Sequence, residues 1–325
     1  MKLAHFILAL LSVLSLPVMA DDPYPNRPIN LIAANPPGGA SDINARILVD
    51  PLSTVLKQPV VVVNRPGAGG AIGAAQVANS KPDGYNLLLA LSSVIVSPEA
   101  EVVNNKKPLY DLNQLEPIAL LSSDPMIIVV RADSPYKTLD DLLKAAKEKP
   151  NTITYSSSGN YGPIHLSVEM LAYQAGVKFV QIPFGGGGPS MIALLGGQVD
   201  LLCDQTTQTI PYIKDGRVKA YGTTTLKRLP AIPNVPTLDE QGLKGFEVKV
   251  WHGMYTPKGV PKPILDKLNA ALKKALNTPD VKKRLEDANI DIVSPDKMTP
   301  NGLKNHLDAE INKWGPIIRK SNIPD

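Results

Sequence analysis

The sequence predicts an α/β protein made of two lobes with a ligand cleft between them, and three observations support this prediction. Short β-branched runs alternate with helical patterns, which is the order of a parallel sheet with helices on both faces. This series of elements occurs twice, once before residue 122 and again from about residue 126. With 325 residues, the chain is too long for one ordinary domain and long enough for two.

The first series of elements predicts the first lobe. Strands are expected at residues 29–34, 60–63 and 86–91, where apolar residues form continuous runs. Helices are expected at residues 41–56 and in a segment that ends at residue 78, each after a turn rich in Pro and Gly. Continuous apolar strands separated by helices predict a parallel-rich sheet.

The second series predicts the second lobe. Its strands are expected at residues 126–130, 153–155, 179–182, 199–203 and 218–223. Amphipathic or small-residue helices separate them, at residues 139–146 and 164–172, in a segment ending at residue 195, and at residues 206–213. A second parallel-rich sheet is therefore expected.

The tail of the chain differs from both series. Its regular patterns are two amphipathic helices, near residues 264–276 and 303–318, and no further strand is expected. We expect these helices to pack on the first sheet. Lobe 1 then comprises residues 21–122 and 224–325, and lobe 2 comprises residues 123–223. Two chain crossings in one region predict a hinge.

The N-terminus predicts export. Lys2 precedes an apolar run over residues 6–19, and Val18-Met19-Ala20 has the small-residue pattern of a cleavage site, so residues 1–20 are expected to be a signal peptide. The alternative, a membrane anchor, needs about 20 apolar residues, more than this run contains. Localisation in the periplasm is therefore expected.

Charge and cysteine content exclude other classes. The whole chain carries a formal charge of +4 and loses one positive charge with Lys2, which is too mild and too scattered for a nucleic-acid-binding protein. Cys203 is the only cysteine, so no internal disulfide can form, and its apolar surroundings predict a buried, inert thiol. We expect a monomer stabilised by its core alone.

Four segments combine glycines with hydroxyl groups at the carboxyl ends of expected strands, where open α/β sheets bind ligands. They are residues 36–42, 64–70, 156–162 and 204–207. Glycine lets a backbone approach a ligand, and helix N-termini offer free N–H groups to a carboxylate. Glycine turns also precede helices in proteins that bind nothing there, so this chemistry alone leaves both interpretations open.

Cofactor and catalytic signals are weak. Gly67, Gly69 and Gly73 approach a dinucleotide fingerprint, but no acidic residue stands about 20 positions later to hold a ribose, so no cofactor is expected. The histidines have no metal-ligand spacing and no nucleophile-elbow motif is present. His165 lies near a candidate loop and could contact a ligand, but the structural role of a hydrogen-bonded histidine is the more common one. Asp42 and Arg46, four residues apart, are expected to form a local ion pair.

Seven motifs are spread over the whole expected mature chain: YPNRPI at 24–29, PPGGASD at 36–42, QPVVVVNRPGAGG at 58–70, PDGY at 82–85, YSSSGN at 155–160, LGGQVD at 195–200 and PNVPT at 233–237. In this order they resemble the Bug-family receptors of tripartite tricarboxylate transporters. Three positions depart from the family pattern: Phe184 stands where a tyrosine is common, Gly185 where a lysine often follows, and Lys57 where a glycine usually precedes Gln58.

The resemblance implies a two-lobe periplasmic binding protein, type II-like, which closes about a hinge on a small carboxylate and delivers it to membrane transporter subunits. The segments at 203–207 and 250–253 look most like members associated with aromatic acids such as terephthalate. The candidate ligand-binding residues are Pro36, Gly38, Gly39, Ala40, Ser41, Asp42, Ser156, Ser158, Gly159, Tyr161, His165, Phe184, Asp204 and Thr206. No catalytic residue, metal or cofactor is expected.

Two alternatives remain open from the sequence. A receptor that only signals to a membrane kinase would have the same fold and cleft. A secreted hydrolase would need a nucleophile held by a histidine, and His165 is the candidate for that role.

Overall fold

The computed structural model describes residues 24–103, 105–159, 162–288 and 290–320, so the expected signal peptide lies outside the described residues. The strands are β1 (Ile29–Ala33), β2 (Val60–Asn64), β3 (Asn86–Leu91), β4 (Leu115–Arg131), β5 (Thr154–Ser157), β6 (Val180–Pro183), β7 (Leu202–Gln205), β8 (Val218–Thr223) and β9 (Lys249–Pro257). The α-helices are α2 (Ala40–Leu56), α3 (Ala71–Ala78), α4 (Ser93–Val103), α5 (Leu139–Glu148), α6 (Pro163–Ala175), α7 (Gly187–Leu195), α8 (Thr206–Lys214), α9 (Lys262–Leu276), α10 (Pro279–Asp287) and α11 (Pro300–Lys320). Short 3₁₀ turns lie at η1 (Ala68–Gly70) and η2 (Leu112–Gln114).

One mixed sheet runs through the molecule in the order β2-β1-β3-β9-β4-β7, with β8 also paired to β4. β1 pairs in parallel with β2 and β3, whereas β9 pairs antiparallel with β3 and β4. β5 and β6 form a separate parallel pair. The prediction that the strands at the beginning of the chain pair in parallel is thus confirmed for β1, β2 and β3.

Two predictions about the sheets are wrong. β4 pairs antiparallel with β7, β8 and β9, so the expected second sheet is not parallel-rich. The tail, in which no strand was expected, supplies β9 at the centre of the sheet. Its sequence, KVWHGMYTP, is buried from Val250 to Pro257 on both faces, and a strand covered on both sides loses the alternation of polar and apolar residues that reveals strands.

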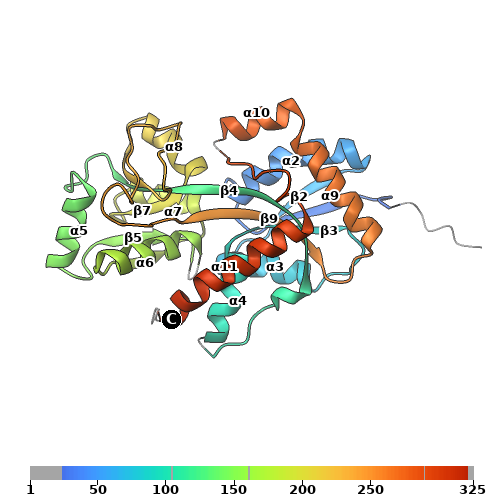
Figure 1. Cartoon of the computed structure of the whole chain (residues 1–325), viewed down its shortest axis with the longest axis horizontal. Coiled ribbons are helices and arrows are strands. Elements are labelled where there is room, and N and C mark those ends of the chain that lie inside the picture. Colours follow the sequence, from blue (N-terminus) through green and yellow to red (C-terminus); the bar gives the residue numbers. More distant parts are fainter. Residues whose placement is uncertain (1–23, 104, 160–161, 289, 321–325) are drawn as a thin grey trace, which may run out of the picture.

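Strands β4 and β9 connect the two halves of the molecule. Figure 1 shows them side by side along the long axis, between the part with α5 to α8 and the part with α2, α3 and α9. β4 pairs with β9 up to Pro125, and from Met126 onward it pairs with β7 and β8. The change of partners lies within a few residues of the crossing expected from the sequence. The limits of the two lobes stay a prediction.

A buried polar cluster lies where β4 and β9 cross between the halves. Ser122 Oγ donates to Asp124 Oδ2 at 2.6 Å and lies 3.0 Å from His252 Nδ1, which is itself 3.2 Å from Asp124 Oδ2. From α2, Asn44 Nδ2 faces His252 Nε2 at 3.5 Å, and Asp124 Oδ1 accepts from the backbone N–H of Asp291 at 2.8 Å. The cluster therefore ties both long strands to α2. We name it the crossover cluster: Asn44, Ser122, Asp124, His252 and Asp291.

The C-terminal helices pack back on the first part of the chain. α9 and α10 contact α2, while α11 lies across β4 and against α4. The packing of the tail on the first lobe was expected from the sequence. The helices α4 and α10 were not expected. No described helix is both long and apolar enough to cross a bilayer.

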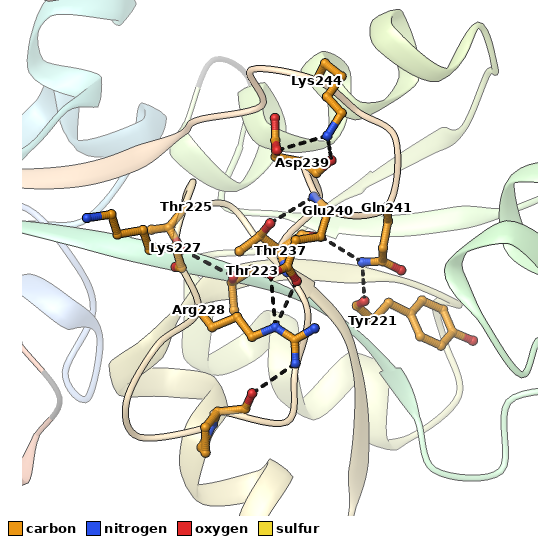
Figure 2. Close-up of polar contacts among 11 residues, drawn as sticks. Tyr221, Thr223, Thr225, Lys227, Arg228, Thr237, Asp239, Glu240, Gln241 and Lys244 are labelled. Atoms are coloured by element: carbon orange, nitrogen blue, oxygen red, sulfur yellow. Dashed lines mark hydrogen bonds and ion pairs between the residues drawn. The ribbon is translucent and has the colours of Figure 1, made fainter.

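The connection between β8 and β9 packs on the edge of β8, as Figure 2 shows. Thr223 donates its backbone N–H to Pro236 and accepts from the N–H of Leu238, both at 3.0 Å. Within the connection, Arg228 Nε and Glu240 Oε2 form an ion pair of 2.8 Å. These bonds cover the edge of a strand that would otherwise offer unpaired backbone groups. The connection thus lies beside a strand of the expected second lobe, although the prediction assigns it to the first.

Candidate ligand-binding site

A cavity lies between the two halves, at the carboxyl ends of β1, β2, β3, β5 and β6, as expected for an open α/β sheet. Its volume is about 380 Å³. We call it the outer cavity. It is lined by Ala34, Asn35, Pro36, Pro66, Gly67, Ala68, Gly69, Gly70, Leu91, Ser158, Gly159, Pro163, Phe184, Gly185 and Gly186.

A second, smaller cavity adjoins the first and shares four lining residues with it. We call it the inner cavity, and its volume is about 20 Å³. It reaches the carboxyl end of β7 and the start of α8. Its walls are Asn35, Ala40, Leu91, Ser158, Pro163, Ile164, Gly187, Asp204, Gln205 and Gln208.

The two halves touch each other around these cavities. Gln208 Nε2 on α8 donates to the carbonyl oxygen of Gly38 at 3.1 Å. Gly186 has φ +145° and lies so close to Pro36 that a Cβ there would stand 3.1 Å from Pro36 Cδ. Because only glycine combines this φ with so close an approach, the glycine turns let the halves close over the cleft.

The loop of residues 36–42 is held by Asp42. Its carboxylate accepts from the backbone N–H of Gly38, from Arg46 Nε and from Asn64 Nδ2, all at 2.9 Å. Burial alone would raise the pKa of Asp42, but the hydrogen bonds from Arg46, Gly38 and Asn64 outweigh it and hold that pKa below its usual value. The expected Asp42–Arg46 pair is thus present, and Asp42 shapes the loop without lining either cavity.

Asp204 is the charged residue of the inner cavity. Its side chain is buried, Oδ1 accepts from the backbone N–H of Gln205 at 2.8 Å, and Oδ2 has no hydrogen-bond partner among the described residues. Burial raises the pKa of Asp204 to about 7, against the smaller lowering effect of the Gln205 hydrogen bond. Gly187 leaves room for this carboxylate, since a Cβ there would lie 2.6 Å from Oδ2.

Three further polar atoms on the inner cavity have no partner among the described residues. They are Asn35 Oδ1, Ser158 Oγ and Gln205 Nε2. Buried polar groups in native proteins are nearly always hydrogen-bonded, so unpaired ones around a cavity indicate a polar ligand or water there. None of the described lining residues of either cavity is Lys, Arg or His. Recognition of an anion would therefore depend on neutral donors.

Backbone N–H groups are the available neutral donors. α2, α6, α7 and α8 begin after Gly39, Gly162, Gly186 and Gln205, and no described side chain caps any of these four helix starts. The first N–H groups of a helix have no partner within it and attract negative charge. The four starts lie at or beside the two cavities.

The structure brings some of the predicted site residues to the cavities and leaves others away from them. Pro36, Ser158, Gly159 and Phe184 line the outer cavity, and Ala40, Ser158 and Asp204 line the inner one. The lining does not include Gly38, Gly39, Ser41, Asp42, Ser156, His165 or Thr206. Gly38 still takes part in closing the cleft through Gln208. Tyr161 lies outside the described residues.

His165 is buried inside its half of the molecule. It stacks on Tyr155, with ring centroids 6.3 Å apart, and Nε2 lies 3.9 Å from Glu169 Oε1. Burial lowers the pKa of His165 to about 4, so the ring is neutral at physiological pH. The histidine that the hydrolase alternative requires therefore lies behind the cavity wall.

Several lining residues were missed as site residues. Pro66 to Gly70 belong to a segment noted for its position, but they were left out of the predicted site. Gly186 and Gln208 had no signal of their own, because a glycine turn and a helical amide side chain occur in most α/β proteins. Their role depends on contacts with the other half of the molecule, where Gln208 meets Gly38 and Gly186 meets Pro36.

A sheet continuous through two halves, with a cleft at the carboxyl ends of strands from both, defines the class of two-lobe periplasmic binding proteins. The profile of the "Tripartite tricarboxylate transporter family receptor" matches residues 44–323, and the chain belongs to this family. The resemblance found in the sequence is thereby confirmed.

Relatives and solved structures agree with this assignment. A protein of Agrobacterium vitis, named "UPF0065 protein in the TAR-I ttuE-ttuC' intergenic region", is 38% identical over 320 residues, which are 98% of this chain and 92% of the relative. The periplasmic binding protein BugD has 38% identity and a TM-score of 0.86, over 92% of this chain and 99% of BugD. MatC from Rhodopseudomonas palustris with bound malate has 32% identity and a TM-score of 0.85, over 91% of this chain and 100% of MatC.

Proposed function

We propose that this protein is a periplasmic receptor that captures a small carboxylate and delivers it to the membrane subunits of a tripartite tricarboxylate transporter. One observation carries the proposal: uncapped helix starts from both halves converge on cavities with no cationic residue in their described lining. Such donors suit a carboxylate. Family membership and the malate-bound MatC support the same ligand class.

The outer cavity limits the ligand to a small molecule. A volume of about 380 Å³ lies near the lower end of the usual range for small-molecule sites. Phe184, Leu91 and Pro66 give it apolar walls, so the body of the ligand would be aliphatic or aromatic. Terephthalate stays a candidate within this class. We propose a monomer, because delivery requires one receptor to open and close on one ligand.

Calorimetry of the ligand-stripped protein tests the proposal. The titrants are succinate, malate, adipate, citrate, aspartate, benzoate and terephthalate. We expect one of them to bind with a one-to-one stoichiometry and a Kd near micromolar, about −8 kcal/mol, and to be recovered unchanged. Absence of binding by every acid, or recovery of a converted product, would contradict the receptor function.

Gly186→Ala is expected to weaken binding of that acid by about tenfold, or about 1.4 kcal/mol. The new Cβ would stand 3.1 Å from Pro36 Cδ at a φ of +145°, and so would strain the closed cleft. Gly188→Ala is the matched control, because no atom lies within 4 Å of a Cβ at that neighbouring position. Equal affinities of the two variants would show that contact between Gly186 and Pro36 is not needed for binding.

A further inference from the structure

We propose that the inner cavity is a subsite for one hydrogen-bond-donating group of the ligand, a hydroxyl or ammonium group, which binds to Oδ2 of Asp204. The inference rests on the proposed carboxylate-receptor function and narrows its ligand to acids that carry such a donor. Three features support it: the size of the cavity, the free oxygen of Asp204, and the other polar atoms around it.

The size of the inner cavity restricts the group that can enter. Its volume is about 20 Å³, and a cavity measured in this way needs about 10–15 Å³ for one water molecule. One heavy atom with its hydrogens therefore fits, whereas the three heavy atoms of a carboxylate do not. The carboxylate and the carbon skeleton would occupy the outer cavity, which shares Asn35, Leu91, Ser158 and Pro163 with the inner one.

The free oxygen of Asp204 decides the polarity of that group. Oδ1 is fixed by the backbone N–H of Gln205, so Oδ2 is the oxygen that has no partner among the described residues. Asp204 is only 3% exposed, and a buried polar atom left unpaired carries a free-energy cost, which is larger if the group is charged. A ligand donor would remove this cost. Burial raises the pKa of Asp204 to about 7 without a ligand, and a donor bound at Oδ2 would favour the ionised form and so lower that pKa.

The neighbouring unpaired atoms offer second partners to the same group. Gln205 Nε2 can donate to the oxygen of a hydroxyl, while Asn35 Oδ1 and Ser158 Oγ can accept further hydrogens of an ammonium. A group of one heavy atom with two to four polar partners is what such a site can satisfy. An acid without the substituent would leave these atoms unpaired.

Matched pairs of acids test the subsite by calorimetry: malate with succinate, aspartate with succinate, lactate with propionate, and mandelate with phenylacetate. In each pair that binds to the wild type, we expect the hydroxy or amino acid to bind at least about tenfold tighter, as for a hydrogen bond to a charged group. Equal affinities within the pairs would overturn the subsite alone. Absence of binding by every acid would overturn the proposed function and the subsite with it.

Asp204→Asn assigns the preference to Oδ2. Because the Gln205 N–H holds the oxygen at the Oδ1 position, the amide nitrogen would face the cavity and turn an acceptor into a donor. We expect the preference within each pair to fall to threefold or less, with a larger loss for aspartate than for malate. Asp215→Asn, an exposed position at the end of α8, is the control and should keep the wild-type preference.

A second variant keeps the test valid if Asp204→Asn folds poorly. Gly187→Ala leaves Asp204 in place but adds a methyl group 2.6 Å from Oδ2, where the ligand donor would lie. It should also reduce the preference. If either folded variant kept the wild-type preference, the donor would not bind at Oδ2 and the inference would be wrong.

Discussion

Between pH 5 and pH 7, the free energy of unfolding of ligand-free Asp204→Asn should rise relative to that of the wild type by about 2 kcal/mol. The cause is the burial of Asp204, which raises the pKa of its carboxyl from 3.8 to about 7 in the folded protein. Between these two values the unfolded chain has released the proton and the folded protein still holds it. The wild type therefore loses up to about 1.4 kcal/mol per pH unit as pH rises through this window, and the asparagine variant does not.

Urea unfolding at pH 5, 6, 7 and 8 measures this difference. Other titrating groups, including the buried His165, act in both proteins and cancel in the comparison. The difference should grow from pH 5 to pH 7 and level off above it, where both states of Asp204 are ionised. Asp215→Asn serves as the control and should give a difference that does not vary with pH. A constant difference for Asp204→Asn would mean that Asp204 is ionised in the folded protein throughout this range.

Sequence patterns predicted the strands that are apolar and bounded by turns. β1, β2 and β3 follow this rule, and each lies within one residue of the expected segment. β9 could not be found in this way, because Trp251, His252 and Gly253 are buried side by side in the centre of the sheet. The antiparallel pairing of β4 was equally hidden, since pairing partners are set by contacts between distant segments.

The candidate site was predictable only in its loops. The positions of the glycine segments at strand ends indicated Pro36, Ser158 and Asp204, and these residues line the cavities. The same loops contain Ser41, Ser156 and Asp42, which are buried and lie outside the lining. Sequence distinguishes poorly between a polar residue that faces a cavity and one that is buried beside it, because the same residue types occur in both places.

The crossover cluster offers the second large effect. Asp124→Ala is expected to lower the free energy of unfolding by about 3–5 kcal/mol, because three buried hydrogen-bonding groups would lose an acceptor, at about 1–3 kcal/mol each. Ser122 Oγ, His252 Nδ1 and the backbone N–H of Asp291 would lose their shared acceptor. Urea unfolding of the ligand-free protein measures the loss.

Asp124→Asn separates the contribution of charge from that of shape in the same cluster. Its amide oxygen can still accept from the N–H of Asp291, so we expect a smaller loss than for the alanine variant. Because Asn44 connects His252 to α2, which begins beside the cleft, the alanine variant should also bind its acid more weakly at temperatures where it stays folded. A loss of stability below about 1 kcal/mol would mean that the contacts of Asp124 stabilise the protein no more than an exposed ion pair does. The buried cluster would then be no structural link between the crossing strands and the cleft.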